Sequence, residues 1–171
     1  LAFDSCEAIT EVHIGSGVMK ISENAFACCK AMVDVHIPDG VTEICRDAFH
    51  GCKSLLTMRI PNSVTTLGDE VFGNCSDLKE LHLPDNITRI PYRLCDGCKS
   101  LEEIHIPDGV TQIGAWAFRD CKALTTIDLG GNDQLSGTLP SGLFDDEALL
   151  CCAPSPLCNA HSPRASAQTD L

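Results

Sequence analysis

Basic residues are scarce in this chain. Its 171 residues include 12 Lys and Arg against 24 Asp and Glu, which gives a formal net charge of -12. Nucleic acids and anionic membranes are bound through basic surfaces, so this balance argues against both kinds of partner. No apolar run reaches the length of a membrane span, which argues against a transmembrane segment.

The short motifs that carry catalysis are also missing. The sequence contains no Gly-x-Ser-x-Gly, no His-Glu-x-x-His and no glycine-rich phosphate loop. Cys95 and Cys98 have the Cys-x-x-Cys spacing of zinc and redox sites, but no second pair completes a four-thiolate site. We therefore expect no enzyme and no cofactor. An initiating Met and a leader are absent too, so a surface, secreted or cytoplasmic location stays open.

What the chain has in abundance is a repeat of 23 residues. A fixed period with no slip is typical of a solenoid in which each coil is one repeat. The first residues begin in the middle of a coil, so we expect the native chain to continue upstream into a cap or further coils. Two columns display the period: Cys6, Cys29, Cys52, Cys75, Cys98 and Cys121, and Ile14, Ile37, Ile60, Leu83, Ile106 and Leu129.

Apolar residues at fixed positions indicate the elements of each coil. A short strand is expected where two inward positions flank an outward one, and a Pro ends it because Pro cannot donate to a ladder. The residues 41–44 and their equivalents predict a second short strand, and 48–52 a tight helical or 3₁₀ return. The predicted inward columns include Val35, Met58, Leu81 and Ile104 in the first strand and Phe26, Phe49, Phe72, Cys95 and Phe118 in the return.

The twelve cysteines admit two interpretations, a disulfide-stapled domain or a column of buried thiols. Stacked parallel strands place equivalent residues about 4.8 Å apart with parallel Cβ vectors. A disulfide needs Cβ atoms roughly 3.5 to 4.5 Å apart and turned toward each other. The repeat position of six of the cysteines therefore favours small, buried, reduced thiols.

The coil pattern resembles the leucine-rich repeats of the BspA type, also called the Treponema pallidum type. The segments 60–68 (IPNSVTTLG) and 48–52 (AFHGC) are examples of the resemblance, which covers roughly residues 1 to 128. It implies a right-handed solenoid with a parallel β-sheet on one face, which binds proteins or surfaces and usually has no catalytic activity. The departures are few: Cys95 stands at a Phe position, Cys45 and Pro91 at Gly positions, and Gly15 at a Pro position.

The pattern changes after Ile127. The segments 124–132 (LTTIDLGGN) and 135–140 (LSGTLP) resemble a plant-type leucine-rich repeat, in which the Asn132 side chain would bond backbone groups at the turn. We expect the leucine-rich repeat solenoid over residues 1–144. Periodicity is lost over 145–171, where Pro- and Ser-containing stretches predict a cap remnant and a disordered tail.

The outward strand positions carry the candidate binding residues. Acids and His share one face, since side chains two residues apart point the same way and coils stack in register. Two squares of two acids and two His result, with the Arg59 coil between them. Imidazole and carboxylate are ordinary Zn²⁺ ligands, although solvated acids that pair with His explain the pattern as well. The candidates are Glu11, His13, Asp34, His36, Arg59, Glu80, His82, Glu103 and His105.

Trp116, the only Trp, occupies a position that is polar in the other coils. It should be partly exposed, either as a hot spot for a partner or packed on a neighbouring coil beside Phe118. The leading functional hypothesis is a non-catalytic scaffold that binds a protein partner through its strand face, with no metal. Two alternatives stay open: an adhesive or structural array at the cell surface, and a metal-dependent module that uses the Glu/His clusters.

Overall fold

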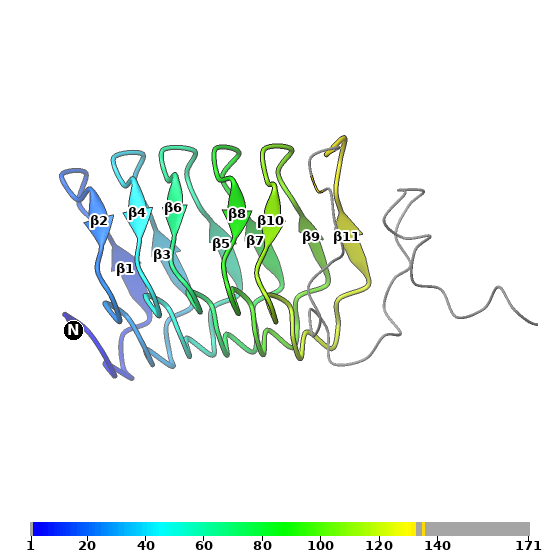
Figure 1. Cartoon of the computed structure of the whole chain (residues 1–171). Coiled ribbons are helices and arrows are strands. Elements are labelled where there is room, and N and C mark those ends of the chain that lie inside the picture. Colours follow the sequence, from blue (N-terminus) through cyan, green and yellow to red (C-terminus); the bar gives the residue numbers. More distant parts are fainter. Residues whose placement is uncertain (1, 133–134, 136–171) are drawn as a thin grey trace, which may run out of the picture.

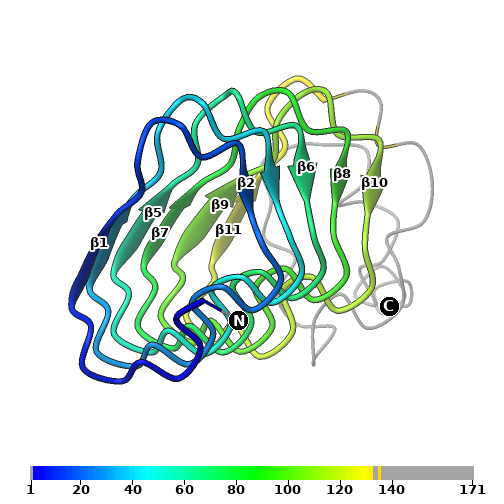
Figure 2. The same cartoon turned by 90° about the vertical axis from the view of Figure 1, so that its left-hand side faces the viewer.

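Residues 2–132 and 135, which the computed structural model describes, wind into a solenoid with two rows of short parallel strands (Figure 1). The first row has three residues a strand: β1 Glu11–His13, β3 Asp34–His36, β5 Thr57–Arg59, β7 Glu80–His82, β9 Glu103–His105 and β11 Thr126–Asp128. The second row has two: β2 Lys20–Ile21, β4 Glu43–Ile44, β6 Thr66–Leu67, β8 Arg89–Ile90 and β10 Gln112–Ile113. Both rows fall where the sequence predicts them, and Figure 2 shows them on opposite sides of the coil.

The register between coils equals the sequence period. Glu11 pairs with Asp34, and His13 with His36, each 23 residues apart. The hydrogen-bonded ladder of the first row is interrupted, however, because β1–β3, β5–β7 and β9–β11 pair while β3 and β5, and β7 and β9, only pack side by side. With three residues in each strand, a small local increase in spacing removes a whole ladder.

The return segment corrects one expectation, because the described residues contain no helix there or elsewhere. The expected tight turn forms, with i→i+3 bonds such as Cys52 N–H to the Phe49 carbonyl at 3.3 Å. Helical winding cannot continue, since left-handed residues stand at both ends of the turn. In the coil of Phe49, Asp47 has φ 55° and Gly51 has φ 71°.

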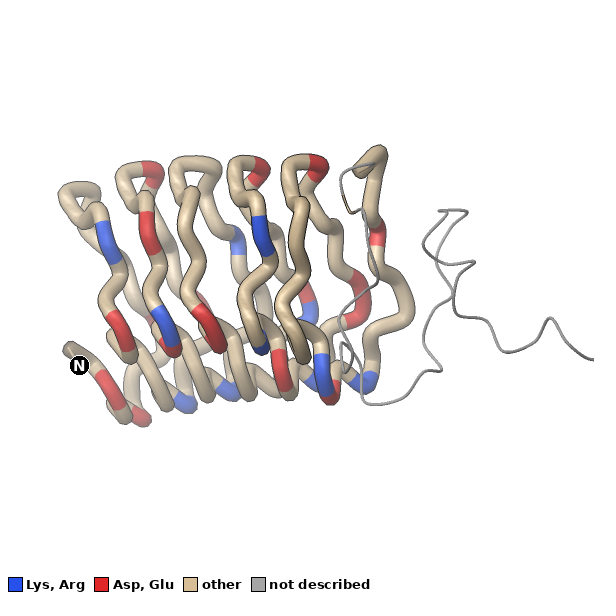
Figure 3. Tube along the Cα trace, viewed as in Figure 1, with Lys and Arg blue, Asp and Glu red and all other residues tan. Residues whose placement is uncertain are grey.

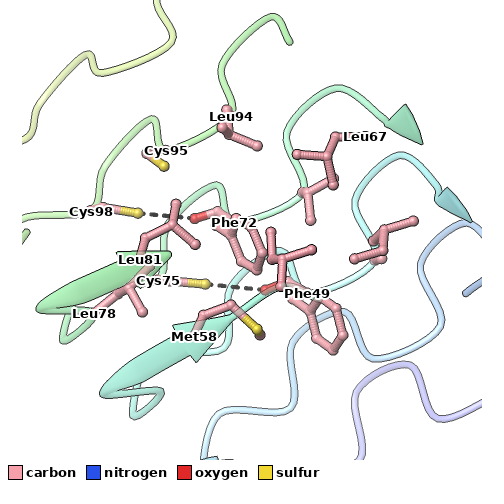
Figure 4. Packing of buried hydrophobic residues seen from close by; sticks show 14 of the residues in the cluster. Phe49, Met58, Leu67, Phe72, Cys75, Leu78, Leu81, Leu94, Cys95 and Cys98 are labelled. Atoms are coloured by element: carbon pink, nitrogen blue, oxygen red, sulfur yellow. Dashed lines mark hydrogen bonds between the residues drawn. The ribbon is translucent and has the colours of Figure 1, made fainter. Parts of the chain in front are cut away.

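The interior consists of stacked columns, as the period predicts. Phe3, Phe26, Phe49 and Phe72 stack face to face, with ring centroids 5.4, 5.5 and 5.9 Å apart and planes within 7°. Phe49 and Phe72 are fully buried, and so is nearly every other inward position. Figure 4 shows Met58 and Leu81 of the strand column packed against these rings. Burying rings of this size supplies much of the free energy that holds one coil on the next.

The cysteine column lies beside the phenylalanine column and is buried from Cys29 to Cys121. From Cys29 to Cys98, each Sγ donates to the backbone carbonyl of the Phe one coil earlier, for example Cys75 to Phe49 and Cys98 to Phe72 at 3.1–3.2 Å (Figure 4). Cys121 donates to the carbonyl of Cys95, which takes the place of the Phe. Burial raises the pKa of the Cys52 thiol to about 12, and those of Cys75 and Cys98 well above their ordinary value. A thiol that is buried, protonated and bonded to backbone, as Cys98 is, is a structural element. Cys95 is fully buried as well, and burial raises the pKa of its thiol.

The coil of Cys95 departs from the others at two adjacent positions. Most other coils have Ala before Phe, as in Ala48–Phe49, and one has Val71 before Phe72. This coil has Leu94 before Cys95 instead, and both residues are fully buried. The larger Leu fills the interior from the neighbouring position while the smaller Cys replaces the ring. The pair is a volume-conserving exchange, which a close-packed core tolerates far better than either change alone.

Asn132, near the end of the described residues, was expected to bond backbone groups at the turn. Its side-chain amide is buried and donates to the carbonyls of Pro107 at 3.0 Å and Val110 at 2.9 Å, which confirms that it bonds backbone at the turn. Residues 133–134 and 136–171 lie outside the described part, so the expectations for 136–144 and for the cap and tail over 145–171 lie outside it too. Among the described residues, no helix has the length and apolarity to cross a bilayer.

Candidate binding surface

The first row of strands presents one exposed polar face. All nine candidate residues on β1, β3, β5, β7 and β9 are exposed, while the residues between them, such as Val35 and Leu81, point into the core. The 23-residue register holds equivalent side chains one coil apart. The exposed side chains of this face are therefore arranged in regular columns that run from coil to coil.

Histidines on this face pair with carboxylates. His13 Nε2 lies 2.8 Å from Glu11 Oε1 within one strand, and His82 Nε2 lies 3.9 Å from Glu80 Oε2. His105 instead turns to the next coil, where its Nδ1 lies 3.0 Å from Asp128 Oδ2. The Gly130 N–H and then His105 hold the pKa of Asp128 below its ordinary value.

The predicted squares of acids and His do not gather into metal sites. Among the described residues, one group places three possible ligand atoms within 4.8 Å of one another: Asp47, His50 and Glu70. It lies on the return segments and shares no residue with either square. Sequence reasoning missed it, although Asp47 and Glu70 occupy the same repeat position and His50 follows Asp47 by three residues.

An apolar pair lies at one edge of the strand face. Val33 and Leu56 occupy the same repeat position just before β3 and β5, and each is 42% exposed. The Leu56 N–H reaches the Val33 carbonyl at 3.5 Å, so the two side chains stand on neighbouring coils. Asp34 and Thr57 follow them directly on the strands. The column was not among the predicted binding positions, because it lies outside the alternation of inward and outward strand residues.

Trp116 is half-buried and packs on the preceding coil. Packing on a neighbouring coil was one of the two alternatives that the sequence offered. The contact of Trp116 there is Tyr92, with ring centroids 5.6 Å apart. The guanidinium carbons of Arg93 and Arg119 lie 4.7 and 5.4 Å from the Trp116 ring centroid. Arg119 in turn makes a two-pronged bond to the buried Asp96. The proposed role of Trp116 as a hot spot stays a prediction.

Charges elsewhere on the coils alternate in sign. Figure 3 shows acidic and basic residues interspersed along the returns. Several pair across one period, as Lys20 does with Glu43 at 2.9 Å. Exposed pairs of this kind contribute little each, so they orient the side chains more than they stabilise the coil.

These features agree with what known proteins show. The family model described as "BspA type Leucine rich repeat region" matches residues 1–131 in six copies. A leucine-rich repeat protein of T. pallidum is 28% identical with a TM-score of 0.66, over 69% of this chain and 57% of that one. A leucine-rich repeat protein from Eubacterium ventriosum is 27% identical with a TM-score of 0.61, over 74% of this chain and 41% of that one. A leucine rich cell surface protein of Faecalibacterium prausnitzii is 26% identical with a TM-score of 0.52, over 75% of this chain and 50% of that one.

The present chain thus spans about half the length of the solved structures it resembles. No curated protein matches it.

Proposed function

The chain belongs to the BspA-type leucine-rich repeat family, and we propose that it is a non-catalytic scaffold that binds a protein partner through its first row of strands. The observation that carries the proposal is the exposed apolar pair Val33 and Leu56 beside a regular field of charged and imidazole side chains. Apolar contact area flanked by polar groups is the usual make-up of a protein–protein interface.

The charges of this face favour a partner with both signs of charge. Arg59 stands among carboxylates and imidazoles, so a partner has to present acids to it and donors to Glu80 and Glu103. Complementary charge of this kind sets orientation and association rate more than affinity. The apolar pair supplies the contact that leaves water on binding.

The proposal is tested with two matched variants of the full chain, each carrying one added acid. Leu56→Asp places the acid at the edge of the strand face, and Thr66→Asp places it on the exposed position of β6 in the second row. Partners captured by the parent and identified are then titrated with each variant. We expect Leu56→Asp to lower affinity at least tenfold and Thr66→Asp to leave it unchanged. Equal effects of the two variants would contradict binding through the strand face.

A second candidate is an adhesive or structural array at a cell surface. The observation that favours it is the likeness to the F. prausnitzii protein, whose name places that protein at the cell surface. In an array, binding depends on the number of coils rather than on one group of side chains. Surface adhesion that survives Leu56→Asp but falls as coils are removed would favour this candidate.

A further inference from the structure

Three side chains of the return segments lie together away from the strand face. Asp47 Oδ1 and His50 Nδ1 are 3.4 Å apart, and a carboxylate oxygen of Glu70 completes a group within 4.8 Å. Two ligands on one tetrahedral Zn²⁺ ion are about 3.3 Å apart, because each bond is about 2.0–2.1 Å long. Asp47 and Glu70 also share a repeat position and a left-handed backbone, with φ 55° and 57°. Their carboxylates therefore point from neighbouring coils to the same side.

The imidazole nitrogen of His50 that lies nearest to Asp47 has no hydrogen-bond partner. His50 Nδ1 is itself buried and without a hydrogen-bond partner, although 29% of the side chain as a whole is exposed. The neighbouring Asp47 oxygen is within ion-pair distance but outside hydrogen-bond geometry. A buried polar atom left in this state is unusual in a folded protein and calls for a ligand or another explanation.

The backbone at Gly73 packs closely against this imidazole. A Cβ at Gly73 would stand 2.7 Å from His50 Nδ1 and 3.1 Å from its Cε1. Gly73 is not among the glycines with positive φ, so its backbone conformation does not demand glycine. Glycine at this position instead lets the chain pass close to the imidazole, which a side chain would displace.

The opposite ring nitrogen is held by Asn74. The amide of Asn74 lies 3.3 Å from His50 Nε2, and the oxygen and nitrogen of an amide can exchange places by a flip. With the oxygen toward the ring, Nε2–H donates to it, and the lone pair is left on Nδ1. A second nitrogen bonded in this way is the usual support of a metal-binding imidazole.

We propose that Asp47, His50 and Glu70 bind one divalent transition metal ion of the Zn²⁺ type, with water in the remaining positions. One imidazole and two carboxylates are a donor set that such ions accept. The site goes beyond the proposed function, because it lies on the returns and uses no residue of the strand face.

Two arginines compete with the ion for these carboxylates. Arg46 lies 3.0 Å from Asp47 Oδ2 and 3.4 Å from Glu70 Oε1, and Arg93 lies 4.0 Å from Glu70 Oε2. Arg46 is 58% exposed, so its long side chain can turn into solvent when the ion binds. The oxygen of Asp47 that faces His50 contacts neither arginine. Removing the Arg46 charge should therefore strengthen metal binding, which is the opposite of what loss of a merely structural ion pair would do.

The experiment is a calorimetric titration of the full chain with Zn²⁺ under reducing conditions. Cys151, Cys152 and Cys158 are changed to Ser throughout, because thiolates bind Zn²⁺ and these lie outside the described residues. We expect the parent to bind one more equivalent than His50→Ala. Asp47→Asn, which suits the left-handed backbone and keeps the fold, should lower the affinity at least tenfold. The double variant of His82→Ala and His105→Ala is the matched control and should bind as the parent does.

Two further variants separate the site from a general loss of structure. Gly73→Ala keeps every ligand but places a methyl group against His50 Nδ1, so it should weaken binding at least tenfold. Arg46→Ala should bind several times more tightly than the parent. The proposal is overturned if His50→Ala and the parent bind the same number of ions with equal affinity. Loss of the ion in the strand-face control, or weaker binding by Arg46→Ala, overturns it as well.

Discussion

The coil that ends in Phe72 and the next one, which ends in Leu94 and Cys95, solve the same packing problem differently. The first extends the stack of rings that begins at Phe3. The second has no ring there, yet both of its inward residues are fully buried. The comparison teaches that the repeat fixes where buried apolar side chains lie rather than which residue stands at each position.

The largest expected effect comes from the coil with the ring. Phe72→Ala removes a fully buried side chain that stacks on Phe49, and the neighbouring coils can close the cavity only in part. We expect the free energy of unfolding to fall by about 3–5 kcal/mol. Urea unfolding of variant and parent measures it. A loss below about 1 kcal/mol would mean that this column is not the core of the solenoid.

The exchange in the second coil predicts strong coupling between its two residues. Leu94→Ala alone should cost about 2–5 kcal/mol, because it leaves a cavity beside the small Cys95. Cys95→Phe alone should cost about 1–3 kcal/mol, because a ring is added next to Leu94. Together they recreate the Ala-Phe pair of other coils, such as Ala48–Phe49, so the double variant should lose much less than the sum. A double-mutant cycle by urea unfolding checks this. Additive losses would refute the volume exchange.

The thiol column is shared by both coils and predicts a pH dependence of stability. The folded pKa of Cys52 is about 12, and those of Cys75 and Cys98 are also raised by burial, so the folded chain keeps protons that the unfolded chain releases. This stabilisation is complete below the unfolded pKa near 9 and is lost as the pH rises toward 12. Each such thiol should lower the free energy of unfolding by up to about 1.4 kcal/mol per pH unit in that window.

Unfolding midpoints between pH 8 and 11 provide the measurement, and Cys52→Ala is the comparison protein. The variant should show a smaller slope than the parent. A parent whose stability does not change over this range would show that these thiols are not buried in their protonated form.

Trp116 packs on Tyr92, which belongs to the coil of Leu94 and Cys95, and it has a left-handed backbone. A large side chain in left-handed backbone, with φ 58°, is strained, but the ring gains contacts with Tyr92 and Arg93. Trp116→Asn and Trp116→Ala both lose the ring, while Asn suits the backbone and Ala does not. We expect Asn to be more stable than Ala by about 1 kcal/mol or less, measured by thermal unfolding. Equal stability would mean that the strain is small.

Most of the fold could be predicted from the sequence, because the 23-residue period and the alternation of Val35-type and His36-type positions are local patterns. For the return, the sequence predicted the tight turn but not its left-handed residues. The conformation of Asp47, for example, cannot be predicted from its own coil alone. The site was harder. The Asp47–His50 contact depends on how a turn directs two side chains, and the close packing of Gly73 against His50 depends on how the next coil stacks. The exposure of Leu56 likewise depends on which edge of the sheet is uncovered.

The smallest expected effect on stability is on the strand face, where the exchanged coil carries His82 and the following coil carries His105. Both are exposed, so changing both to Ala should leave the unfolding midpoint nearly unchanged, even though the interiors beneath them differ.

The effect of changing His82 and His105 should appear in partner binding instead. A carboxylate oxygen of Glu80 lies 3.9 Å from His82, and one of Asp128 lies 3.0 Å from His105, so both imidazoles stand beside acids on this face. Partner affinity of the parent should therefore change across the range where His titrates, and the double variant should lose that change. Titrations of a captured partner at pH 5.5, 6.5 and 7.5 measure it. Parallel pH profiles of parent and double variant would show that the two histidines are ordinary surface residues, and would leave Val33, Leu56 and Arg59 to account for recognition.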